Sequence, residues 1–362
     1  MRKTAAKLLA AVAIATSVAT VATGTAVADP STLPTLPLAQ DIVGVGSDTT
    51  QAVLNQFSTD YNAFLGAGST LPRLYSWDAT GSATIQTKVG ATTPFNRPNG
   101  SGAGIASLTS VSKTTVDFAR SSRGPKNSVP GGAPGDPLSD LFVAFAKDAV
   151  SYATKTTGSN APINLSKADL VKIYNCDVTT WRGLNPADLT LPTTTIKAYL
   201  PQASSGTRSF FLQALGLANA GACVTVNPTV QENQGTDPIL NDADAIVPYS
   251  VAHYIGQVYN GHGAGTDQAG NLTIRSIDGI APVAADNTLS LSFSNSVFGR
   301  VVYNVVRDTE WAATDTQGTA LRAIFGSNGW VCKNATAIAD IKSYGFRTLP
   351  VGACGSTTRA TS

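Results

Sequence analysis

Residues 203–209 have the sequence ASSGTRS, and the apolar run FFLQAL follows at 210–215. The apolar run predicts a helix, and the Ser-Gly-Thr turn predicts its N-terminus. Unpaired backbone N–H groups, the hydroxyls of Ser205 and Thr207, and the helix dipole all favour an anion at such a start. Serine and threonine are also the commonest helix N-caps, so this stretch alone is either a cap or one wall of an anion site.

Three further turns carry the same chemistry. Ser47-Asp48-Thr49-Thr50 follows a short apolar strand expected at 41–45, Gly100–Gly104 opens a helix, and Arg120–Arg123 follows a strand expected at 115–119. In open α/β sheets ligands bind at the carboxyl ends of the strands. We therefore expect the four turns to surround one oxyanion.

Strand and helix patterns alternate along the chain, which predicts an α/β protein with parallel sheets. Residues 141–146 form a continuous apolar strand of the kind that is buried in a parallel sheet or passes between lobes, and 297–306 is a second strong strand. A chain of 362 residues exceeds a typical domain of about 100–200 residues. We therefore expect two lobes.

The N-terminus predicts export. Residues 1–28 carry Arg2 and Lys3, an apolar stretch from 8 to 21 and the small-residue end Ala26-Val27-Ala28, the pattern of a signal peptide. Residues 29–40 contain three prolines and are expected to form an extended arm. No cysteine for a lipid anchor lies near the cleavage site, and no later run suits a membrane span, so we expect a secreted or cell-wall-associated protein.

Charge and cysteine content exclude several classes of partner. Without Arg2, Lys3 and Lys7 the basic residues fall from 25 to 22 against 23 acidic residues, a net charge of −1, so neither nucleic acid nor an anionic membrane is an expected partner. In an exported chain four cysteines predict disulfides, and chain order favours Cys176–Cys223 and Cys332–Cys354, although three pairings are possible. With only His253 and His262 available, no metal or cofactor is expected.

The chain resembles the phosphate-binding proteins of ABC importers, and its composition resembles their actinobacterial branch. The matching stretches occur in the family's order within residues 41–250, and they are 44–49, 100–105, 115–119, 173–175 with Trp181, and 205–208. The resemblance implies the two-lobed class II periplasmic-binding-protein fold. Each lobe would be a mostly parallel sheet flanked by helices, with the ligand in the cleft between them. Lobe I would comprise 41–148 and 251–362, and lobe II 149–250.

The resemblance also implies the residues of the site. Two departures concern charge: Ser122 replaces the usual acceptor aspartate, and Pro201 replaces an arginine. Asp48 could supply the acceptor or only cap a helix, and Arg120, Arg123 or Arg208 could supply the cation or lie at the surface. The expected ligand residues are Ser47, Asp48, Thr49, Ser101, Gly102, Ser122, Arg123, Ser205, Gly206, Thr207 and Arg208.

The expected function is the capture of inorganic phosphate or a similar oxyanion for delivery to an ABC permease, by a monomer without enzymatic activity. One alternative is a secreted or wall-associated protein that uses the fold for adhesion or sensing. Another is a phosphatase-like hydrolase in which His253 or His262 serves Ser205 or Ser101 as a base. The chain contains no G-x-S-x-G, G-x-x-x-x-G-K-[ST] or H-E-x-x-H motif to support the hydrolase.

Overall fold

The computed structural model describes residues 29, 36–91, 93–128, 134–226 and 230–361. The signal peptide expected over 1–28, and residues 30–35 of the expected N-terminal arm, lie outside the described residues. Among the described residues, none of the helices is both long enough and apolar enough to cross a bilayer.

One sheet extends through the described part of the molecule, with the strand order β2-β1-β5-β13-β6-β10-β8-β9 and with β11, β14 and β15 also paired to β6. The strands are β1 (Ile42–Gly46), β2 (Leu74–Ser76), β5 (Phe118–Ser121), β6 (Asp140–Lys155), β8 (Lys197–Leu200), β9 (Thr225–Val226), β10 (Ala245–Ser250), β11 (Leu272–Ile274), β13 (Gly299–Arg307), β14 (Arg347–Thr348) and β15 (Thr357–Thr358). Two small ribbons lie apart from it, formed by β3 (Thr84–Ile85) with β4 (Phe95–Asn96) and by β7 (Asn164–Leu165) with β12 (Ser276–Ile277).

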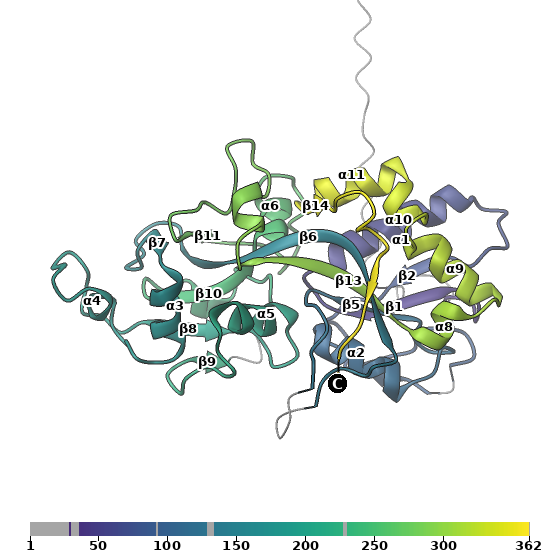
Figure 1. Ribbon diagram of the computed structural model, residues 1–362, viewed down its shortest axis with the longest axis horizontal. Coiled ribbons are helices and arrows are strands. Elements are labelled where there is room, and N and C mark those ends of the chain that lie inside the picture. Colours follow the sequence, from purple (N-terminus) through teal and green to yellow (C-terminus); the bar gives the residue numbers. More distant parts are fainter. Residues whose placement is uncertain (1–28, 30–35, 92, 129–133, 227–229, 362) are drawn as a thin grey trace, which may run out of the picture.

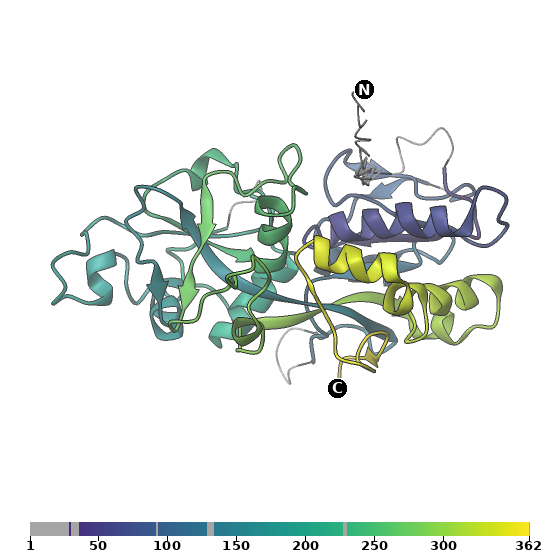
Figure 2. The same ribbon diagram turned by 90° about the horizontal axis from the view of Figure 1, so that it is seen from above.

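The two ends of this sheet are parallel, and its centre is antiparallel. Strands β2, β1 and β5 are parallel to one another, as are β10, β8 and β9, whereas β6 and β13 run antiparallel between these groups. Strand β6 pairs with β13 over residues 140–149 and with β10 and β11 over 150–155. The strand predicted at 141–146 therefore passes between two lobes, as Figures 1 and 2 show.

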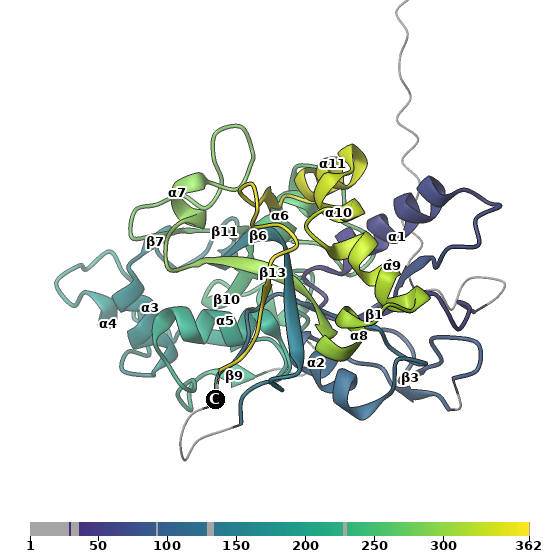
Figure 3. The same cartoon turned by 45° about the vertical axis from the view of Figure 1, so that its right-hand side comes forward.

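Helices cover both faces of the sheet in the first lobe. Ile42 packs in a cluster with α1 and α9–α11, while its neighbour Val43 packs with α2, because successive strand residues face opposite sides. Figure 3 shows α1 and α9–α11 on one side and α2 on the other. The helices are α1 (Gln51–Leu65), α2 (Ser101–Ser110), α3 (Lys167–Tyr174), α4 (Trp181–Leu184), α5 (Gly206–Leu215), α6 (Val251–Val258), α7 (Leu291–Ser294), α8 (Asp308–Ala312), α9 (Thr316–Phe325), α10 (Trp330–Lys333) and α11 (Ala335–Ser343).

The second lobe extends further along the chain than the expected boundary at residue 251. Tyr254, Leu272, Phe293 and Phe298 all pack in the apolar cluster formed around β8, β10 and α5. The reason is that β11 pairs with the far half of β6, and the chain returns to the first lobe only along β13. Residues 251–298 thus contribute mainly to the second lobe, although the sequence analysis assigned them to the first.

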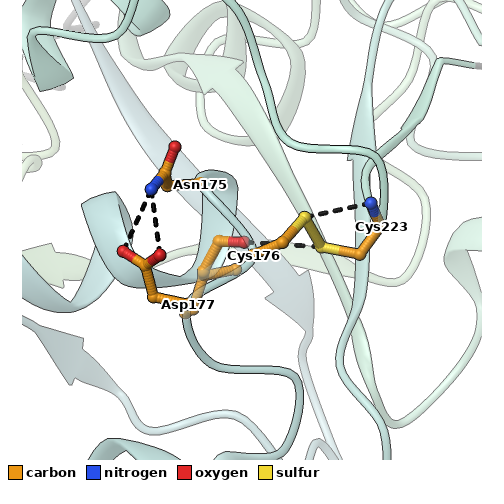
Figure 4. Close-up of a disulfide and its surroundings, with 5 residues drawn as sticks. Asn175, Cys176, Asp177 and Cys223 are labelled. Carbon is orange, nitrogen blue, oxygen red and sulfur yellow. Dashed lines mark hydrogen bonds between the residues drawn. A yellow bond between two sulfur atoms is a disulfide. The ribbon is translucent and has the colours of Figure 1, made fainter.

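Each lobe contains one disulfide. Cys176–Cys223 joins the residue after the C-cap of α3 to the segment before β9, as seen in Figure 4, and Cys332–Cys354 joins α10 to the C-terminal segment. The pairing favoured by chain order is confirmed.

Candidate functional site

The four predicted turns meet where the two lobes touch. The N-termini of α1 and α2 come from the first lobe, and that of α5 comes from the second. The Gly102 N–H donates to the Ser204 carbonyl oxygen at 2.9 Å, and the hydroxyls of Thr49 and Thr207 lie 3.2 Å apart. Helix N-termini carry partial positive charge, so their convergence favours an anion.

Small side chains allow this close approach. The hydroxyls of Ser101 and Ser122 lie 3.2 Å apart, and a Cβ at Gly206 would collide with both. Ser101, Ser122, Ser205 and Thr207 are buried. We call the group formed by Thr49, Ser101, Ser122, Ser205, Gly206 and Thr207 the cradle.

The structure adds Glu232, which the sequence analysis missed. Its carboxylate accepts hydrogen bonds from the Thr49 hydroxyl, from the Thr207 hydroxyl at 3.3 Å and from the Thr207 N–H at 3.4 Å. Its own N–H donates to Asp48 Oδ2 at 3.1 Å, and the residue is 2% exposed. The only sequence signal was that Glu232, one of two glutamates in the chain, lies in the polar run Gln231–Gln234.

Asp48 and Glu232 form a buried carboxyl pair with opposite pKa shifts. Burial, followed by the charge of Glu232, raises the pKa of Asp48 well above its usual value. Burial by itself would also raise the pKa of Glu232, but hydrogen bonds from Asp48, Ser205 and Thr49 and the charge of Arg300 bring it below its usual value. Asp48 therefore keeps its proton to a higher pH than Glu232 does, since two adjacent carboxylates resist ionising together.

Several buried oxygens near the cradle lack a hydrogen-bond partner in the described part of the chain. Ser47 Oγ, Thr50 Oγ1, Asp48 Oδ1 and Asn233 Oδ1 have no partner among the described residues. Asp48 and Asn233 also line a cavity of about 40 Å³, together with Gln51, Thr80, Gln231, Gln234, Thr266 and Asp267. Buried polar atoms are nearly always paired in proteins, so the oxygens of Asp48 and Asn233 mark a cavity where a small polar molecule such as water can bind.

Two of the three arginines are used outside the cradle. Buried Arg120 donates to the carbonyl oxygens of Ser47 at 2.9 Å and Trp77 at 2.7 Å, and burial lowers its pKa to about 10. Arg123 forms a two-bond ion pair with Asp136 at 2.6 and 2.8 Å. The Arg123 guanidinium is thus directed to Asp136 and not to the cradle, whereas the Arg120 guanidinium holds the backbone of the first turn at Ser47.

Arg208 takes part in the cradle through its backbone. Its N–H donates to Ser205 Oγ at 2.9 Å, which is the N-cap bond of α5, so the cap predicted for this stretch is present. Burial lowers the pKa of the Arg208 guanidinium.

The two histidines have other partners. His253 Nδ1 lies 3.0 Å from the Thr49 carbonyl oxygen and Nε2 lies 2.7 Å from Asp267 Oδ1. His262 Nε2 lies 2.7 Å from the Ser343 hydroxyl, and its ring stacks on Tyr344. In the described structure neither ring is hydrogen-bonded to Ser101 or Ser205.

Comparison with known structures identifies the same architecture. An ABC-type phosphate transport receptor from Vibrio cholerae is 17% identical with a TM-score of 0.53, and the match covers 86% of this chain and 100% of the receptor. A Clostridium perfringens structure described as a phosphate ABC transporter substrate-binding protein with bound phosphate is 13% identical with a TM-score of 0.54, and again 86% and 100% of the two chains are covered. At these identities the likeness concerns the fold. No curated protein matches the chain in sequence.

The family itself is shown by a sequence model. The model described as "PBP superfamily domain" matches residues 20–290, which is well over half of the chain and includes all four turns of the cradle. This match shows that the two-lobed chain belongs to the PBP superfamily.

Proposed function

We propose that this protein is an exported solute-binding protein that captures inorganic phosphate, or a similar oxyanion, and delivers it to the permease of an ABC importer. The observation that carries the proposal is the cradle, in which the N-termini of two ten-residue helices, α2 and α5, meet with the hydroxyls of Thr49, Ser101 and Thr207. Donors of this kind bind oxyanions without a basic side chain.

Binding would be coupled to movement of the lobes. Thr49, Ser101 and Ser122 belong to the first lobe, whereas Ser205, Gly206 and Thr207 belong to the second, so an anion held by both sets favours the closed arrangement. Strands β6 and β13 connect the lobes and would act as the hinge. A monomer suffices for this cycle, and no chemical step is required.

The structural neighbours support the choice of phosphate. Two neighbours with TM-scores above 0.5 are titled as phosphate transport proteins, and one of them contains phosphate. The resemblance of residues 205–208 and 100–105 to the same family's loops points to the same ligand.

The proposal is tested by calorimetric titration of the protein without residues 1–28 with phosphate, with sulfate as competitor. Thr207→Val removes a hydroxyl of the cradle and should weaken phosphate binding by roughly tenfold to a hundredfold, the value of one or two hydrogen bonds to a charged group. Thr193→Val, at an exposed position in the loop before β8, is the matched control. Absence of micromolar binding of any oxyanion would contradict the proposal.

Glu232 favours a second candidate function. Its carboxylate already contacts the donors that an anion would use, and Ser122 and Pro201 replace the usual aspartate and arginine. A secreted or wall-associated protein that uses the closed fold for adhesion or sensing would show this arrangement. Such a protein would bind no oxyanion in the wild type or in any cradle variant, and titration separates the two functions.

A further inference from the structure

The Glu232 carboxylate accepts the hydrogen bonds that an anion in the cradle would accept. Its carboxylate lies at the N-terminus of α5 and accepts from the backbone N–H of Thr207 and from two hydroxyls. A carboxylate and a phosphate share the chemistry that matters here, which is negative charge spread over oxygens that accept several hydrogen bonds.

Glu232 also joins the two lobes. It lies between β9 and β10 in the second lobe, yet it contacts Thr49 through its side chain and Asp48 through its backbone, both in the turn that precedes α1 of the first lobe. Nearby, the Asn99 side chain of the first lobe donates to Gln231 Oε1 at 2.9 Å and accepts from Gln202 Nε2 at 2.7 Å. The residues flanking Glu232 thus lie against the first lobe in the closed arrangement.

We propose that Glu232 is an internal ligand that occupies the cradle, holds the lobes closed in the absence of an anion, and must be displaced before an oxyanion can bind. That Glu232 holds the lobes closed does not depend on the proposed function, whereas its displacement by an anion does. The Glu232 carboxylate competes for the same donors and repels an incoming anion. Its displacement therefore makes the donors available and removes the repulsion at the same time. Glu232 would then set the oxyanion concentration at which the protein becomes half-saturated.

Small-angle X-ray scattering in phosphate-free buffer tests the closed state directly. Glu232→Ala should increase the radius of gyration relative to the wild type, because the hydrogen bonds to Thr49 and Thr207 are lost. Glu232→Gln keeps the shape of the side chain but loses the charge. It should also increase the radius of gyration, but by less. Asp177→Asn removes an exposed carboxylate from the same lobe and should leave the radius unchanged. An unchanged radius in both Glu232 variants would overturn the proposal.

Phosphate titration of the same four proteins tests displacement. Glu232→Ala should bind phosphate at least ~10-fold more tightly than the wild type, since no hydrogen bonds of a charged group must first be broken. Equal or weaker binding by both Glu232 variants would overturn displacement while leaving phosphate capture in place. If Glu232→Ala opens the lobes but no protein binds phosphate, the closing role of Glu232 is supported and the proposed function fails.

Discussion

At the scale of single residues, Gly206 controls how closely the lobes approach. A Cβ at this position would collide with the hydroxyls of Ser101 and Ser122, both in the first lobe. Gly206 is the first residue of α5, where alanine is intrinsically the better helix former. The glycine is therefore explained by the contact between lobes and not by the helix.

Gly206→Ala should consequently weaken phosphate binding by about tenfold or more while leaving the thermal stability of the protein nearly unchanged, since closure and not folding is obstructed. Titration calorimetry and thermal unfolding measure the two effects. Gly68→Ala is the control, because a Cβ there meets no atom within 4 Å. Normal affinity in Gly206→Ala would show that binding does not need the closed contact.

Asp340 carries a pH-dependent cost to stability. Burial, followed by the charge and hydrogen bond of Asp60, raises the pKa of Asp340 to about 7. A folded-state pKa above the unfolded value means that the folded protein retains a proton that the unfolded chain has lost, so stability falls as the pH rises from about 4 to 7.

Asp340→Asn should therefore raise the free energy of unfolding at pH 8 by about 1–2 kcal/mol, a figure reduced for partial solvent screening, and by little near pH 4. Urea unfolding at the two pH values measures the difference. Asp177→Asn, at an exposed position in the second lobe, is the control. An equal gain at both pH values would show that the effect is not one of ionisation.

At the scale of elements, a buried ion pair joins β6 and β13, the two strands that pass between the lobes. Asp148 of β6 accepts from Arg300 of β13 at 2.7 and 2.9 Å, from the Ser250 hydroxyl at 2.8 Å and from the Ala252 N–H at 2.9 Å. The carboxylate therefore ties both connecting strands to the end of β10 and the start of α6, at the point where the lobes meet.

Asp148→Ala should lower the free energy of unfolding by about 3–5 kcal/mol, because it leaves the buried Arg300 guanidinium without its counter-charge. Guanidinium chloride unfolding measures this loss. The exposed Asp177→Ala, in the second lobe, should change stability by less than about 0.5 kcal/mol. A loss of similar size in both variants would contradict the special role of the ion pair.

At the scale of the whole molecule, the two disulfides stabilise separate lobes. They span 47 residues in the second lobe and 22 in the first. A cross-link reduces the entropy of the unfolded chain more when it closes a longer loop. The second-lobe disulfide should therefore contribute slightly more to stability.

Replacing Cys176 and Cys223 together by serine should cost about 4 kcal/mol, and replacing Cys332 and Cys354 together about 3 kcal/mol, according to the loop-closure relation. Chemical unfolding of the two double variants compares them, with each serving as the control for the other. A much larger loss from the shorter loop would show that contacts in the folded state outweigh chain entropy.

The sequence by itself determined those features that depend on neighbouring residues. Alternating strand and helix patterns indicated the α/β class, Ser, Gly and Thr at strand ends and helix starts indicated the four turns, and chain order favoured the disulfide pairs. Each of these signals is local, because periodicity and capping act within a few residues.

Only the tertiary structure decided the features that depend on residues far apart in the chain. Glu232 contacts Thr49 across 183 positions, and Arg300 pairs with Asp148 across 152 positions. The chain returns to the first lobe only along β13, because β11 still pairs with the second-lobe half of β6. Charge pairing and strand pairing over such separations depend on the assembled fold, and the order of residues does not reveal them.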